Sequence, residues 1–133
     1  MSNENTEIAL RYLNDVWNAK KREQIDELIA DNFVDHHYPP GFPPGPVGAK
    51  KWLDYVTGAF PDINCGIEDI IAEGDKVVVR YILSGTHVGE FAGIPATNKK
   101  ISVAAVSIYY MEQGKIAESW VISGLIGAIR TPD

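Results

Sequence analysis

The sequence predicts an α+β fold in which a few helices and a curved antiparallel sheet enclose a single apolar pocket. Apolar residues recur at helical spacing as far as Phe60, and after Asp62 they alternate with a period of two. The alternating segments are long and carry apolar side chains on both faces. Runs of helices followed by runs of strands favour this class over a doubly wound parallel sheet.

The first half of the chain is expected to form three helices. They run from about Asn5 to Lys20, near Glu23–Ala30 and over roughly Val47–Ala59. Pro46 suits the first turn of the third helix, because the N–H that proline lacks would have no partner within the helix at that position. Their apolar stripes contain Ile8, Tyr12, Leu13, Val16, Trp17, Ile25, Leu28, Ile29, Trp52, Leu53, Val56 and Phe60. Residues 38–46 hold five prolines and two glycines, so we expect an irregular loop there, either a cover for the pocket or a stiff connector.

The second half is expected to form the sheet. Long strands are predicted at Lys76–Thr86, at Lys100–Met111 and from Lys115 to about Gly124, with a short extended piece earlier at residues 33–37. A sheet with one solvated face would alternate more cleanly between apolar and polar residues. We therefore expect helices to cover one face of the sheet and a partner subunit to cover the other.

The composition is that of an ordinary globular chain, and its charge excludes several partners. Hydrophobic residues make up 45% of the 133 residues, which suits one domain over residues 1–133. The net charge is −6 and no stripe of lysine and arginine follows a face, which argues against binding to nucleic acid or to an anionic membrane. The N-terminal residues are polar, and no apolar run reaches the ~18–20 residues of a membrane helix, so we expect a cytoplasmic protein.

Potential metal ligands are few. Cys65 is the single cysteine, so neither an internal disulfide nor a thiolate cluster is expected. The three histidines, His36, His37 and His87, lack the spacing of a metal site, and a zinc site needs three or four convergent ligands. The sequence therefore predicts no metal centre.

Several short sequence elements occur in an order and spacing typical of one family. The first half contains Val16-Trp17-Asn18, Asp31-Asn32-Phe33-Val34-Asp35-His36 and Phe60-Pro61-Asp62. The second half contains residues 74–81 (GDKVVVRY), 85–97 (GTHVGEFAGIPAT) and 114–120 (GKIAESW). Over nearly its whole length the chain resembles the SnoaL-like polyketide cyclases, also called ester cyclases, of the nuclear-transport-factor-2-like superfamily.

The resemblance implies a cone-shaped, curved antiparallel sheet of four to six strands, closed by the three N-terminal helices, in a homodimer that packs through the sheet. It also implies an enzyme of polyketide metabolism that uses neither metal nor cofactor. The characterised cyclases deprotonate an acidic carbon of an aromatic polyketide methyl ester, and the enolate then attacks a carbonyl of the same molecule. The expected substrate is thus a small polycyclic ketone or ester.

One position departs from the family pattern. The cyclases place an Asp that acts as general acid/base four residues after the tryptophan that matches Trp120, and here that position is Gly124. The chain is therefore either a cyclase or isomerase whose acid/base group lies elsewhere, or a non-catalytic protein that binds a small apolar or aromatic molecule on the same fold. Ketosteroid-isomerase-like and limonene-epoxide-hydrolase-like reactions are less favoured, because neither the Tyr/Asp donor pair nor the Asp–Arg–Asp arrangement is recognisable.

Histidines are the candidate catalytic residues, because the ordinary pKa of histidine lies near physiological pH. His36 matches the family's histidine position, so we prefer it to His37 as the base. His87 ends a long strand between two glycines, where the chain can bend towards the mouth of the pocket. The structural alternative is that these side chains only hydrogen-bond the loop backbone.

The candidate binding residues are mostly aromatic, because flat rings offer a ligand a large contact area. They are Tyr12, Trp17, Trp52, Phe60 and Trp120, for each of which core packing is the alternative role. Gly124 is added to the pocket as a position that leaves space. Glu118 lies on the strand of Trp120, where it is expected either to replace the missing acid or to form an ion pair, for which Arg80 is the suggested partner.

Overall fold

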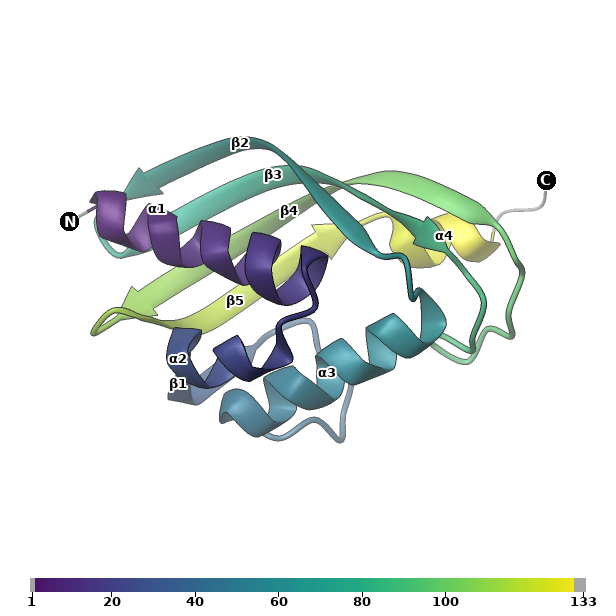
Figure 1. Ribbon diagram of the computed structural model, residues 1–133, viewed down its shortest axis with the longest axis horizontal. Helices are drawn as coiled ribbons and strands as arrows, with labels where there is room; N and C mark the ends of the chain where they lie inside the picture. The colour runs from purple at the N-terminus through teal and green to yellow at the C-terminus, as the bar shows by residue number, and fades with distance from the viewer. Residues whose placement is uncertain (1, 131–133) are drawn as a thin grey trace.

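The computed structural model describes residues 2–130, and its centre is a curved five-stranded sheet. The strands are β1 (Ile29–Asp35), β2 (Asn64–Glu73), β3 (Lys76–Thr86), β4 (Lys100–Glu112) and β5 (Lys115–Ser123). Their order across the sheet is β1-β5-β4-β3-β2. Figure 1 shows the strands arching over the helices. The α+β class and the curved sheet are confirmed.

The sheet is mixed, whereas the sequence predicted a wholly antiparallel one. Strands β2 to β5 form an antiparallel meander, but β1 runs parallel to β5 at the edge and pairs Asp35 with Ser119. No hairpin turn sets the direction of β1, because most of the chain lies between it and β5. The pairing of β1 with β5 begins at Ile29. The helix expected over Glu23–Ala30 therefore ends earlier, at Leu28.

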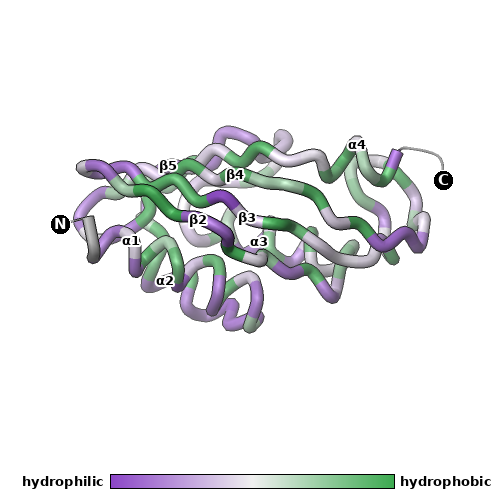
Figure 2. Tube along the Cα trace, turned by 90° about the horizontal axis from the view of Figure 1, so that it is seen from above, coloured by the Kyte–Doolittle hydropathy of each residue, from purple (hydrophilic) through white to green (hydrophobic). Residues whose placement is uncertain are grey.

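Four helical segments accompany the sheet, and three of them lie on its concave side. They are α1 (Ser2–Arg11), which continues as the π-helix η1 (Tyr12–Asn18), then the short turns η2 (Arg22–Gln24) and α2 (Ile25–Leu28), and α3 (Gly45–Ala59). Figures 1 and 2 both place α1, α2 and α3 on the same side of the strands. A fourth, unexpected helix, α4 (Leu125–Arg130), follows β5 at the far end of the sheet.

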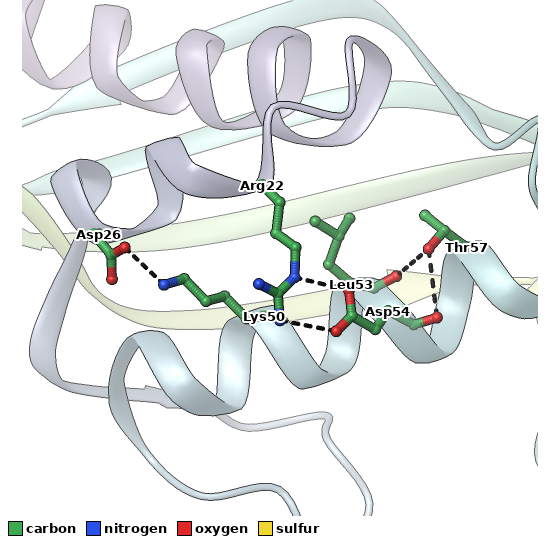
Figure 3. A network of polar contacts seen from close by, with 6 residues as sticks. All are labelled: Arg22, Asp26, Lys50, Leu53, Asp54 and Thr57. Atoms are coloured by element: carbon green, nitrogen blue, oxygen red, sulfur yellow. Dashed lines mark hydrogen bonds and ion pairs between the residues drawn. The ribbon is translucent and has the colours of Figure 1, made fainter.

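Polar contacts fix α3 against the segment that precedes β1, as Figure 3 shows. The guanidinium of Arg22 donates two hydrogen bonds of 2.9 Å to the carboxylate of Asp54, and Nζ of Lys50 lies 2.6 Å from Oδ2 of Asp26. Trp52 lies between Lys50 and Asp54 in the sequence, and its side chain is buried. Since residues spaced by two point to different sides of a helix, these surface contacts hold the Trp52 side towards the interior.

The two faces of the sheet have different surroundings. On β3 the side chains of Val77, Val79 and Tyr81 are buried beneath the helices. On the outer face large apolar side chains remain exposed, and Ile71 and Ile122 keep 62% and 64% of their surface accessible. Figure 2 shows hydrophobic residues continuing along the strands. No helix among residues 2–130 has the length and apolar character needed to span a membrane.

The suggested ion pair between Arg80 and Glu118 is wrong. Arg80 lies 3.1 Å from Glu68 on β2, and Glu118 lies 2.9 Å from Nε2 of His36. The reason is the strand order, because β4 separates β3 from β5.

Candidate active site

The space between the helices and the inner face of the sheet is a cavity of about 410 Å³. This size is within the usual range for small-molecule sites, roughly 300–1,000 Å³. Its lining comes from η1, α3, α4, the end of β1 and the loop after it, the loop between β3 and β4, and the inner faces of β2 to β5. The aromatic residues of the lining are Tyr12, Trp17, Tyr38, Trp52, Tyr55, Tyr81, Phe91 and Tyr109. Ser107, Ser119 and Ser123 also face the cavity from β4 and β5, and their short side chains leave space there.

The proline-rich loop at residues 38–46 forms part of the cavity wall. Tyr38 and Pro39 line the cavity, and the ring of Phe42 packs edge-on against Trp52 with 5.3 Å between centroids. Tyr38 also lies 5.1 Å from Trp52. The loop is thus attached to α3 through aromatic contacts.

Asp35 and His37 form the polar centre of the wall. The side chain of Asp35 is only 5% exposed, and its Oδ1 accepts a 2.8 Å hydrogen bond from the backbone N–H of His37 as well as a hydrogen bond from Nδ1 of the same histidine. Oδ2 of Asp35 accepts a hydrogen bond from the hydroxyl of Ser119. In the neutral imidazole that donates Nδ1–H to this carboxylate, Nε2 carries the lone pair and is the atom that can accept a proton.

Strand pairing explains why these residues meet. Asp35 on β1 pairs with Ser119 on β5, and Ser119 pairs with Tyr109 on β4. The three side chains therefore form one row across the inner face. Ser107 lies two residues before Tyr109 on β4. Its hydroxyl is 2.8 Å from the hydroxyl of Tyr81 on β3.

The tyrosines of the cavity remain neutral phenols. Burial raises the pKa of Tyr12, Tyr38, Tyr81 and Tyr109 above the ordinary value, and the neighbouring carboxylate of Asp35 raises the first three further. Burial likewise raises the pKa of the Cys65 thiol to about 12. The cavity is therefore lined by neutral phenols, a protonated thiol and the hydrogen-bonded pair of His37 and Asp35.

Of the predicted binding residues, the structure brings Tyr12, Trp17 and Trp52 together in the cavity wall. Tyr12 and Trp17 belong to η1, whose wide turns bury four of its seven residues. Phe60 is fully buried but outside the lining, where it packs edge-on against Phe91 at 5.5 Å.

The remaining predicted binding residues also lie outside the lining. Trp120 and Glu118 are on the outer face of β5, because they alternate with Ser119 and Val121, which line the cavity. Gly124 is exposed, between Ser123 and Leu125, which both line the cavity. The period of two along β5 thus decides which side chains reach the cavity.

The two histidines proposed as catalytic occupy different environments, neither of them in the lining. His36 stacks on Trp120 at 4.3 Å on the outer face and is hydrogen-bonded to Glu118. His87 is 0% exposed and stacks on Phe60, and its Nδ1 lies 2.9 Å from the hydroxyl of Thr97. Within residues 2–130 its Nε2 has no hydrogen-bond partner.

Asp35 is the residue of this centre that the sequence reasoning missed, and His37 was ranked below its neighbour. The signal was present in the sequence, because Phe33, Asp35 and His37 alternate with a period of two. Phe33 is 1% exposed and Asp35 follows it on the same inner face of β1, while His37 lines the cavity from the turn after the strand.

Comparison with known proteins agrees with this architecture. The model of the SnoaL-like polyketide cyclase family matches residues 7–131. The chain belongs to this family. It is 25% identical over 108 residues to nogalonic acid methyl ester cyclase of Streptomyces nogalater, covering 77% of this chain and 78% of that protein. It is 27% identical over 116 residues to aklanonic acid methyl ester cyclase DauD of Streptomyces sp. (strain C5), and the match covers 82% of this chain and 70% of that protein.

A solved structure shares the fold of this chain. The structure of TsrD from Streptomyces laurentii has a TM-score of 0.86 and 25% identity, covering 98% of this chain and 95% of that one. The overall fold of this chain is therefore also that of TsrD.

Proposed function

We propose that this protein is a cofactor-independent cyclase that closes a ring in a flat ketone or ester substrate by intramolecular aldol condensation. The observation that carries the proposal is the pair of Asp35 and His37 in the wall of an aromatic cavity. A histidine whose Nδ1–H is held by a buried carboxylate is the usual arrangement for a side chain that takes a proton at Nε2.

The reaction follows from this pair. Nε2 of His37 takes a proton from the acidic carbon beside a carbonyl, and the enolate forms a carbon–carbon bond to a second carbonyl of the same molecule. The alkoxide that results takes the proton back from Nε2. No atom is gained or lost, so the product is an isomer of the substrate. Asp35 holds the ring of His37 in place and stabilises the imidazolium that forms between the two transfers.

The lining supports a neutral, flat substrate. Its aromatic walls offer contact area, and no lysine or arginine is among the described residues that line it. The relatives named above act on methyl esters, in which the carboxyl group carries no charge. We therefore propose an aromatic β-keto ester as the substrate class.

The test is incubation of the wild-type protein with an anthraquinone-type β-keto methyl ester in H₂O and in D₂O. Ring closure gives a product of the same mass in H₂O with a changed absorbance spectrum. Exchange of the acidic hydrogen for deuterium, measured by mass, shows deprotonation even if closure is slow. If the wild-type protein gives neither hydrogen exchange above the buffer rate nor a new absorbance spectrum, the proposal is contradicted.

A second candidate is a binding protein without turnover, which the family's missing Asp at Gly124 favours. The structure adds a reason, because Gly124 and its neighbours bring no acid/base side chain of their own to the cavity. This candidate expects saturable binding of the same ester with no hydrogen exchange. Exchange catalysed by the wild-type protein contradicts it.

We also propose that the outer face of the sheet binds a second copy of the chain. The face exposes Ile71 and Ile122 together with the stack of His36 on Trp120. Sedimentation should give a dimer for the wild type and a monomer for Ile122→Glu. The matched control is Val47→Glu, since Val47 is 67% exposed on α3 away from this face. A monomeric wild type would contradict this pairing.

A further inference from the structure

A cluster of hydroxyl groups covers part of the inner face of the sheet, where core positions are ordinarily apolar. It comprises Tyr81, Ser107 and Tyr109 on adjacent strands and Tyr12 on η1. All four side chains are at least 95% buried, and all four line the cavity. Burying a hydroxyl costs free energy unless it is hydrogen-bonded, so this concentration calls for a ligand-related explanation.

The hydroxyls of Tyr81, Ser107 and Tyr109 bond to one another, whereas that of Tyr12 is hydrogen-bonded to Tyr38. The Tyr81 and Ser107 hydroxyls lie 2.8 Å apart, and the hydroxyl of Ser107 also lowers the pKa of Tyr109 by hydrogen bonding, against the larger effect of burial. Each hydroxyl has one proton to donate and two lone pairs. In a chain of hydroxyls, each donating to the next, one proton remains undonated at the end of the chain.

Asp35 is the carboxylate of the cavity wall, and within the described residues none of its hydrogen bonds comes from this cluster. They come from Ser119 on Oδ2 and from His37 on Oδ1. Tyr109 lies beside Ser119 in the strand register, so the cluster adjoins the pair of Asp35 and His37. The proton that is left undonated within the cluster is therefore available to a molecule bound in the cavity, next to the proposed base.

We propose that this cluster is a binding site for a carbonyl oxygen of a flat polycyclic ketone or quinone. The phenol hydroxyls of Tyr81 and Tyr109 are the donors to that oxygen, and Ser107 links the two phenols by hydrogen bonds. The inference deepens the proposed function and rests on it only in taking the cavity as the place where the substrate binds. The same donors stabilise negative charge on that oxygen when the neighbouring carbon loses its proton. Burial supports this role, because it keeps the phenols protonated.

The experiment compares two probes of one shape, xanthone and xanthene, which differ in carrying C=O or CH₂ at the central ring. Affinities are measured by quenching of tryptophan fluorescence, to which Trp17 and Trp52 in the wall contribute. We expect the wild type to bind xanthone about threefold to tenfold more tightly than xanthene, as one net hydrogen bond provides. In Tyr81→Phe/Tyr109→Phe the ratio should fall close to one while xanthene binding is retained.

The matched control is Tyr55→Phe. Tyr55 also lines the cavity, but its hydroxyl is engaged by Oε2 of Glu90 at 3.1 Å and by the backbone N–H of Ala92 at 2.8 Å. The xanthone-to-xanthene ratio should therefore stay at the wild-type value. An equal loss in Tyr55→Phe, or an unchanged ratio in the double variant, overturns the assignment.

A second measurement does not depend on the double variant folding. The infrared C=O stretch of xanthone bound to the wild type should lie below its value in an aprotic solvent and move back in Ser107→Ala. An unshifted band, or failure of the wild type to bind either probe, overturns the assignment. Selective xanthone binding without turnover of the β-keto ester would contradict the proposed function and leave this inference standing.

Discussion

Asp35 affects His37 in two ways: its hydrogen bonds orient the imidazole ring, and its negative charge stabilises the imidazolium. The Asp35→Asn variant separates these two effects. The backbone N–H of His37 donates to Oδ1 at 2.8 Å, so the acceptor oxygen of the asparagine amide should occupy this position. The NH₂ group then replaces Oδ2 and faces the hydroxyl of Ser119, which can reverse its role and accept. The geometry around His37 is retained, and only the negative charge is lost.

The magnitude follows from that difference. A hydrogen bond to a charged group contributes ~1.5–3 kcal/mol and a neutral one ~0.5–1.5 kcal/mol, so the imidazolium loses about 1–1.5 kcal/mol of stabilisation. We expect the rate of hydrogen exchange or ring closure to fall roughly 5- to 15-fold. The free energy of unfolding should change little, because every donor around the side chain keeps an acceptor.

Asp35→Ala is the contrasting variant. It leaves the backbone N–H and Nδ1–H of His37 and the hydroxyl of Ser119 without their acceptor, in a site where the carboxylate is only 5% exposed. We expect a loss of about 2–4 kcal/mol in stability, measured by denaturant unfolding, and turnover at the background level. A full rate in Asp35→Asn, or equal losses of stability in both variants, would refute this reasoning about orientation and charge.

Three further predictions concern other parts of the fold. Because burial raises the pKa of Cys65 to about 12, its alkylation at pH 8 should be at least on the order of a hundredfold slower in the folded protein than in denaturant, as mass spectrometry can follow. The Thr86 backbone N–H and hydroxyl lower the pKa of Asp62, so Asp62→Ala should cost up to about 1 kcal/mol near neutral pH. A carboxyl group whose pKa is lowered in the folded protein stabilises the fold at pH values above its ordinary pKa of about 4. The difference in thermal midpoint between Asp62→Ala and the wild type should therefore shrink as the pH falls below about 4. Trp52→Ala removes a buried ring in contact with Tyr38 and should cost about 3–5 kcal/mol and weaken xanthone binding, measured by unfolding and titration.

Local patterns predicted the elements whose structure is decided locally. The alternation of apolar residues placed β3 at Lys76–Thr86, the bounds that the structure has, and the helical spacing placed α3 to within two residues at its start. The parallel pairing of β1 with β5 could not be seen, because it joins segments some 80 residues apart that no short turn connects.

The candidate site shows the same division. Tyr12, Trp17 and Trp52 were identified because an aromatic residue on the apolar stripe of a helix faces the interior in any packing. His36 and His37 are neighbours in the turn that follows β1, where His36 stacks on Trp120 on the outer face and His37 lines the cavity. The choice between them depended on a register that only the pairing of Asp35 with Ser119 reveals.

The central claim is that His37, held by Asp35, moves the proton in the cavity. The most direct test measures hydrogen exchange and ring closure of the β-keto methyl ester with His37→Ala and His36→Ala side by side. We predict that His37→Ala loses a factor on the order of 10²–10⁴ in rate, while His36→Ala, altered on the outer face, stays near the wild-type rate. A full rate in His37→Ala, or a loss confined to His36→Ala, would contradict the account.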